Sequence, residues 1–217
     1  MSDIDIEQIP GIPGTLPPGE FVIWQGRPQW RAIARHVFKL PWVAGWLGLF
    51  ASIRVGLELS SGAGILGSAF AIGLTALCLG ILVATSVGFA RSTIYTITSR
   101  RIVFRIGVAV PMSVNVPFHI IAAANLRVPS ANGTGDIELE LSGPNRIAWL
   151  NLWPHVGGGQ FARPRPTLKC LADAQQVASV LREAVAAWAK LEGRRLSTTA
   201  SGAEVPNSSP MPTAVQA

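Results

Sequence analysis

The sequence predicts an α+β membrane protein, in which a two-helix transmembrane hairpin precedes a small antiparallel β-barrel closed by a C-terminal amphipathic helix. Three observations predict it. Between Leu40 and Ala90 the chain carries only two charged side chains. From Ser92 onward, β-branched and aromatic residues form short runs separated by Gly, Pro and Asn, as in a small all-β domain. After Asp173, apolar residues recur at helical spacing as far as Leu191.

Residues 41–90 are expected to form the transmembrane hairpin. Crossing a bilayer takes roughly 20 apolar residues. The uncharged stretch Leu59–Ala90 is too long for one straight span and begins with a Ser/Gly-rich run at residues 60–64. We therefore expect two spans joined by that turn, the first over Pro41–Leu57 and the second over Ile65–Val87.

The two charges of the hairpin, Arg54 and Glu58, are expected near its tip. They lie four residues apart, so they can pair on one helical face, and a long Arg side chain can reach the interface. A functional charge inside the membrane is the alternative. Glycines recur in both spans, which suits close helix packing and permits a homodimer.

Residues 20–40 are expected to contain a short strand and then a basic amphipathic helix on the membrane surface. Each basic side chain near anionic headgroups contributes on the order of 1 kcal/mol. We predict that four residues bind anionic membrane lipid: Arg27, Arg31, Arg35 and Lys39. The alternative is that these residues only set the topology.

The charge distribution orients the hairpin. Basic residues flank it on both sides, whereas the connection between the spans carries only the Arg54–Glu58 pair. The positive-inside rule then places both termini on the cytoplasmic side of the membrane, which in a bacterium is the inner (intracytoplasmic) membrane. The net charge of +6, in a chain with seven Trp and this hairpin, favours a lipid surface over nucleic acid as partner.

Residues 91–193 are expected to form the folded cytoplasmic domain. Strand-forming runs cover residues 92–98, 101–106, 112–116, 120–128, 137–141 and 146–153. Six or seven antiparallel strands and a C-terminal helix describe a pleckstrin-homology-like (PH-like) half-open barrel, although other small barrels share this pattern. We expect the helix to end at Gly193 and Trp188 to plug the open end. The Pro/Gly-rich segment 1–19 and the Ser/Thr-rich segment 194–217 are expected to be disordered.

No catalytic constellation is recognisable in the sequence. The three histidines, His36, His119 and His155, lie far apart and have no Cys, Asp or Glu at ligand spacing. No nucleophile-elbow, P-loop or zinc-protease motif is present. We therefore expect a binding protein without enzymatic activity, metal or cofactor.

The best candidate for a partner-binding edge is aromatic and proline-rich. Aromatic side chains are enriched among interface anchors. The edge consists of Trp149, Trp153, Pro154 and His155. Because Trp149 and Trp153 lie four apart on one strand face, they could instead fill the barrel core.

Several motifs between Leu16 and Leu191 point to a known family. They are Leu16–Glu20 with Trp24–Gly26 and Pro28, the Y-x-I-T-x-x-R run Tyr95–Arg101, Pro117–Ala124, Gly133–Ile137, Leu152–His155 and Phe161–Pro164. Together they resemble the PuhB family of photosynthetic complex assembly proteins of purple bacteria, which are PH-like membrane proteins.

The resemblance implies a membrane-anchored assembly factor for the photosynthetic reaction centre and core light-harvesting complex. Its expected partners are reaction-centre and core-antenna polypeptides, bound at the cytoplasmic membrane face. The alternative is a general lipid-surface-binding PH-like module unrelated to photosynthesis. The basic helix and the barrel support both equally.

Overall fold

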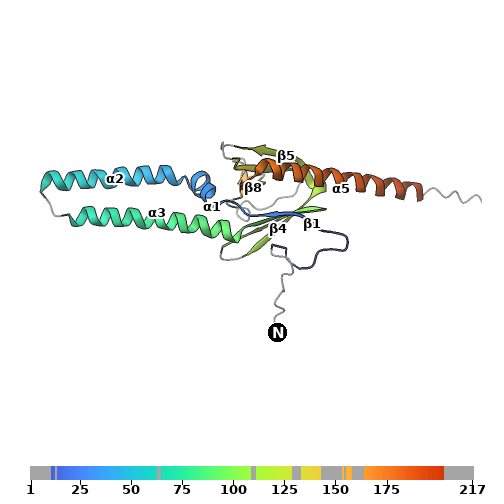
Figure 1. Cartoon of the computed structure of the whole chain (residues 1–217), viewed down its shortest axis with the longest axis horizontal. Coiled ribbons are helices and arrows are strands. Elements are labelled where there is room, and N and C mark those ends of the chain that lie inside the picture. The colour runs from blue at the N-terminus through green and yellow to red at the C-terminus, as the bar shows by residue number, and fades with distance from the viewer. Residues whose placement is uncertain are drawn as a thin grey trace, which may run out of the picture.

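A helical hairpin projects from one side of a β domain, and a long C-terminal helix leaves on the other side (Figure 1). The computed structural model describes residues 11–12, 14–62, 65–108, 111–128, 133–142, 153, 155–157 and 164–202, with side chains to residue 194. The elements before the β domain are β1 (Val22–Gly26), α1 (Trp30–Ala32), the π-helix η1 (Ile33–Val37), α2 (Leu40–Ser61) and α3 (Leu66–Ser92).

The elements after the hairpin follow one another with short connections. They are β2 (Ile94–Thr98), β3 (Arg101–Ile106), β4 (Met112–Pro117), the 3-10 helix η2 (Phe118–Ile120), β5 (Ile121–Arg127), β6 (Gly135–Leu141), β7 (Val156–Gly157), β8 (Arg165–Leu171) and α5 (Ala174–Gly202). The expected strand over residues 146–153 lies outside the described residues, apart from residue 153.

The hairpin is an insertion between two paired strands. Strand β1 precedes it and β2 follows it, and the two pair antiparallel, with Val22 opposite Thr98 and Gly26 opposite Tyr95. Strand β1 is therefore part of the β domain, not of a separate interfacial segment. Both ends of the hairpin consequently meet the domain at the same place.

The strands form two four-stranded antiparallel sheets, ordered β1-β2-β3-β4 and β5-β6-β8-β7. The two sheets of the expected half-open barrel are not joined by a hydrogen-bonded ladder among the described strands, so the barrel is not closed there. Helix α5 contacts strands of both sheets and covers one side of the space between them.

The core lies between the sheets and α5. Side chains alternate across a strand, so every second residue of each central strand faces inward. The largest fully buried core side chains are Tyr95, Ile97, Ile102, Phe104, Phe118, Ile137, Leu139, Leu168 and Leu171. Helix α5 contributes Val177, Leu181 and Ala184 from its apolar stripe.

At the C-terminal end the structure contains a strand that was not predicted and a helix that is longer than expected. Strand β8 lies in a proline-containing segment that would ordinarily indicate a loop. Pro166 fits there because it stands at the start of the strand, opposite Val156 of the two-residue strand β7. Helix α5 continues through Gly193 to Gly202. An added Cβ at Gly193 would meet nothing within 4 Å. An exposed helix glycine costs roughly 1 kcal/mol relative to Ala, which weakens a long helix without ending it.

The hairpin helices are each long and apolar enough to cross a membrane. The expected ion pair at the tip is confirmed, with Arg54 Nη2 3.0 Å from Glu58 Oε1. The Glu58 carboxylate also accepts hydrogen bonds from the backbone N–H and hydroxyl of Ser68 on α3. This cluster ties the two helices together beside their connection.

The glycines of the spans do not form the expected close helix contact. An added Cβ would meet nothing within 4 Å at Gly45, Gly48, Gly56, Gly73 and Gly80. Gly67 is different, because a Cβ there would collide with the Glu58 carboxylate and the Arg54 guanidinium. Among the described glycines of the hairpin, Gly67 is the one at which an added Cβ would force neighbouring side chains, those of the Arg54–Glu58 pair, to shift.

Candidate functional site

The four basic residues predicted to bind lipid are all exposed beside the start of the hairpin. Arg31 and Arg35 lie on the short helical segment formed by α1 and η1, which ends at Val37, whereas Arg27 precedes this segment and Lys39 follows it. The apolar residues of the segment, Ala32 and Ile33, are buried in a small cluster with Ala90 and Cys170, so the segment is packed onto the protein. Arg31 and Arg35 therefore face outward while Ala32 and Ile33 face the protein, and lipid binding stays a prediction.

Trp153 lies where the hairpin joins the β domain. Its ring is 45% exposed and makes an edge-to-face contact with Phe89 of α3, with ring centroids 5.7 Å apart. Phe89 in turn contacts Phe38, at 6.1 Å. This aromatic group therefore belongs to the junction with the hairpin. Trp149 and Pro154 lie outside the described residues.

His155 is not available to a partner, which corrects its predicted place on a binding edge. Its side chain is 1% exposed. Nδ1 lies 2.6 Å from the Tyr95 hydroxyl, and Nε2 lies 3.1 Å from the Thr93 hydroxyl. Because the N–H of Lys169 donates to the Tyr95 oxygen, the tyrosine proton is free to be donated to Nδ1. Burial, reinforced by the charge of Lys169, lowers the pKa of His155 to about 3, so the imidazole is neutral.

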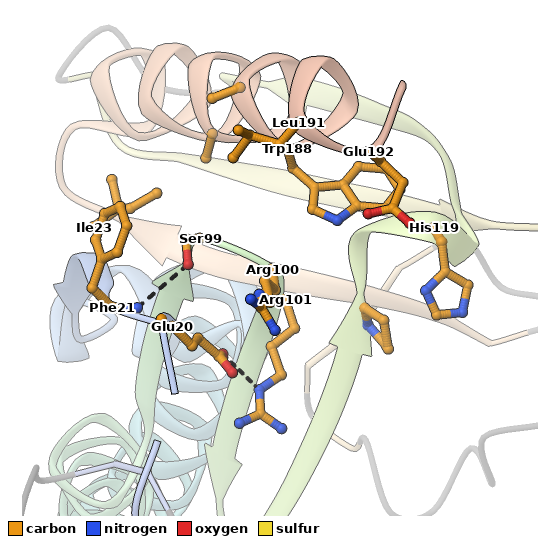
Figure 2. A pocket seen from close by; sticks show the side chains of 14 residues that line it. Glu20, Phe21, Ile23, Ser99, Arg100, Arg101, His119, Trp188, Leu191 and Glu192 are labelled. Atoms are coloured by element: carbon orange, nitrogen blue, oxygen red, sulfur yellow. Dashed lines mark hydrogen bonds and ion pairs between the residues drawn. The ribbon is translucent and has the colours of Figure 1, made fainter. Parts of the chain in front are cut away.

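A groove of about 740 Å³ lies between the start of the first sheet and α5 (Figure 2). Its apolar lining comes from Phe21, Ile23, Pro117, Ala184, Ala187, Trp188 and Leu191. Phe21 is 62% exposed and Leu191 is 58% exposed. Exposed apolar side chains that line a hollow are typical of an interaction site.

The polar residues of the groove hold one wall in place. Glu20 Oε1 accepts hydrogen bonds from Arg101 Nε at 2.9 Å and from the Thr98 hydroxyl at 2.7 Å. The Glu20 side chain is almost fully buried, and this pairing compensates its charge. The chain entering β1 is thus fixed to the β2–β3 turn. His119, Arg100 and Glu192 also line the groove.

The opposite wall is the second half of α5. Trp188 is half-buried and packs edge-to-face on Phe118, with ring centroids 6.2 Å apart. Figure 2 shows its indole projecting from the helix toward the strands. The expected plug residue therefore contacts the core with one side and lines the groove with the other.

This groove is suited to bind an apolar segment of another polypeptide. It lies on the second half of α5, which leaves the domain on the side away from the hairpin (Figure 1). Sequence reasoning missed Phe21 and Ile23. They could have been found from the alternation of side chains along β1. Val22 and Trp24 are half-buried on one face of the strand, so the apolar residues Phe21 and Ile23 lie on the other, exposed face.

Comparisons with known proteins agree with this architecture. The chain matches the bacterial PH domain family over residues 43–185. It is 34% identical, over 189 residues, to a Rhodobacter capsulatus protein described as an uncharacterized 23.7 kDa protein in the puhA 5′ region. That match covers 85% of this chain and 88% of the relative.

A solved structure from Shewanella loihica, a DUF1696 family protein with a pleckstrin-homology domain, is also similar. It is 13% identical, with a TM-score of 0.29, and the match covers 43% of this chain and 71% of that one. A score this low does not bear on the fold. The matches to the family and to the Rhodobacter relative confirm the resemblance drawn from the sequence motifs. The chain belongs to the bacterial PH domain family.

Proposed function

We propose that this protein is a membrane-anchored assembly factor for the photosynthetic reaction centre and core light-harvesting complex. In this proposal its groove holds a segment of a client subunit at the cytoplasmic membrane face. The observation that carries the proposal is the position of the groove, on a PH-like domain into which a membrane-type hairpin is inserted between β1 and β2.

The hairpin supports the anchoring part of the proposal. Both of its ends join the β domain, so the domain stays beside the membrane that the helices enter. Basic residues flank both ends, including Arg91 at the end of α3. The positive-inside rule then favours the cytoplasmic face of the inner membrane. Because the groove lies on the side of the domain away from the hairpin, the client in this proposal is a cytoplasmic segment that extends past the β domain.

The Rhodobacter relative supports the photosynthetic part. It is described by its place in the puhA 5′ region, which suggests a photosynthesis-related context for that protein and, in this proposal, for this chain. The groove supplies the means of binding, because aromatic and aliphatic anchors at its centre are the groups that typically dominate protein–protein affinity.

A complementation experiment tests the proposal. A strain lacking the gene should accumulate less assembled reaction-centre core complex, with pigment synthesis and subunit transcripts largely intact. The native gene should restore assembly, whereas a copy with Phe21→Ser and Leu191→Gln should not. Both changes remove exposed groove side chains, so the protein should still accumulate. Leu126→Gln, an exposed position on β5 outside the groove, serves as the matched control.

An affinity-tagged copy provides the second measurement. The native protein and the Leu126→Gln control should recover reaction-centre or core-antenna polypeptides from solubilised membranes, and the groove variant should recover fewer. Normal core-complex assembly in the deletion strain, with no such subunit recovered, would contradict the proposal. A general lipid-surface module would then take its place.

A further inference from the structure

A second cavity lies beside the start of the hairpin and is separate from the groove. Its volume is about 220 Å³, comparable to the space of roughly seven liquid water molecules. Three parts of the chain converge on it: the η1–α2 connection, the β5–β6 connection and the end of β8. Its lining residues are His36, Lys39, Arg127, Thr134, Gly135, Asp136 and Cys170.

The lining carries two cations, Lys39 and Arg127, against the single carboxylate of Asp136, and this excess of positive charge suits an oxyanion. Lys39 and Arg127 are exposed cations from distant parts of the sequence, and the His36 imidazole lies with them. One oxygen of Asp136 accepts the N–H of Cys170 at 2.8 Å. Burial raises the pKa of the Cys170 thiol to about 12, so this thiol adds no negative charge. Lys and Arg are the side chains that most often bind phosphate groups.

The backbone around the cavity is strained in a way that marks functional sites. Lys39, with φ 53°, and Cys170, with φ 57°, are the two non-glycine residues with positive φ in the described part of the chain. Both line this cavity. His36 lies in a π-helix, a rare element that often occurs at functional sites. Sparsely populated backbone conformations of this kind cluster at ligand-binding sites.

The place of the cavity identifies the source of the anion. Lys39 immediately precedes α2, the first of the two membrane-type helices. A residue at that position lies at the level of lipid headgroups when the hairpin spans a bilayer. We propose that this cavity binds the phosphate group of an anionic membrane lipid, with Lys39, Arg127 and His36 as its ligands.

This site differs from a diffuse attraction between a basic helix and a membrane. Arg31 and Arg35 are exposed on the same short helical segment but do not line the cavity. A surface attraction would depend on the number of charges, whereas a bound phosphate depends on the cations that surround it. The proposal does not depend on the assembly function, because it concerns lipid binding by the isolated full-length protein.

Paired variants with equal charge loss separate the two cases. The site variant carries Lys39→Asn and Arg127→Gln; Asn tolerates the left-handed backbone better than most residues do. The matched control carries Arg31→Gln and Arg35→Gln. Full-length protein in nonionic detergent is titrated with dioctanoyl phosphatidylglycerol, dioctanoyl phosphatidylcholine or inorganic phosphate, and bound ligand is counted by native mass spectrometry.

We expect the native protein and the matched control to bind phosphatidylglycerol in preference to phosphatidylcholine and to inorganic phosphate. The site variant should bind it roughly 30-fold more weakly. Arg127→Gln alone, at an exposed strand end, should lose roughly fivefold with an unchanged melting temperature. Equal loss in the two double variants would overturn the site in favour of surface attraction. Inorganic phosphate binding as tightly as phosphatidylglycerol would overturn the lipid as its source.

Discussion

At the scale of single residues, the buried imidazole of His155 connects segments that are far apart in the sequence. It contacts Thr93 and Tyr95 at the start of β2, and its carbonyl accepts the N–H of Thr167 on β8. The first sheet is thereby joined to the second where no strand ladder joins them. The ring must stay neutral to fill this place, because burial strongly disfavours its charged form.

This histidine should make the protein sensitive to acid. In the unfolded chain the imidazole titrates near its ordinary pKa of 6.5, whereas burial lowers the pKa in the folded state to about 3. The unfolded state therefore binds more protons between these values. The neutral ring therefore makes its full contribution to the free energy of unfolding above pH 6.5. This contribution is lost as the pH falls toward 3, by up to about 1.4 kcal/mol per pH unit.

Thermal melts of the full-length protein between pH 7.5 and pH 4 measure the slope of stability against pH. His155→Gln should be less stable at neutral pH but show a flatter dependence on pH. His119→Gln, which changes an exposed histidine, should keep the native slope. An unchanged slope in His155→Gln would mean that other groups determine the acid sensitivity.

Residue-level prediction from the sequence succeeded where the contact is local. The Arg54–Glu58 pair follows from a spacing of four on a helix, and the structure contains it. The hydrogen bonds that Ser68 donates to Glu58 and the contact of His155 with Tyr95 depend on which segments the fold brings together. No spacing rule contains that information, so His155 was assigned to a surface although it is buried.

At the scale of elements, α5 has two roles along its length. Its first turns place Val177, Leu181 and Ala184 in the core, while Trp188 and Leu191 lie progressively further out. Strand positions were predictable because β-branched runs and alternation mark them directly. Strand β8 was not, because its flanking prolines resemble those of a loop. The groove could not be derived either, since it depends on how α5 crosses the sheets.

Substitutions along α5 should separate these roles. Trp188→Ala removes a half-buried ring from Phe118, so it should lower the free energy of unfolding by about 2 kcal/mol, less than the ~3–5 kcal/mol typical of a fully buried Trp. Leu191→Ala, at an exposed position, should change it by less than about 0.5 kcal/mol. Denaturant unfolding of the full-length protein in detergent measures both. Equal effects would mean that the helix is a uniform structural support.

At the scale of the whole molecule, the hairpin is built into the β domain, because the strands on either side of it pair with each other. The sequence predicted two spans and a β domain, and it placed the spans within a few residues of α2 and α3. It did not reveal that β1 completes the first sheet, because pairing between Val22 and Thr98 leaves no local trace.

The insertion predicts a specific sidedness for the chain. A cysteine at Ser61, at the end of α2, should react with a membrane-impermeant maleimide in intact spheroplasts. A cysteine at Gln176 on α5 should react only after the membrane is opened. The native protein is the control, because Cys170 is buried and Cys78 lies within α3. The reverse labelling pattern would contradict the orientation inferred from the charges.

The pairing of β1 with β2 across the hairpin also orders the steps of biogenesis. Closing a flexible loop of this length costs roughly 4 kcal/mol of chain entropy. Two antiparallel helices in a bilayer return their outer ends to the same membrane face, so they hold β1 and β2 near one another before either strand has paired. During synthesis β1 must wait until the second helix has left the ribosome, because its partner β2 follows that helix in the chain. When the hairpin crosses a bilayer, completion of the first sheet therefore requires both helices to be inserted, because a chain with one inserted helix would leave β1 and β2 on opposite faces of the membrane.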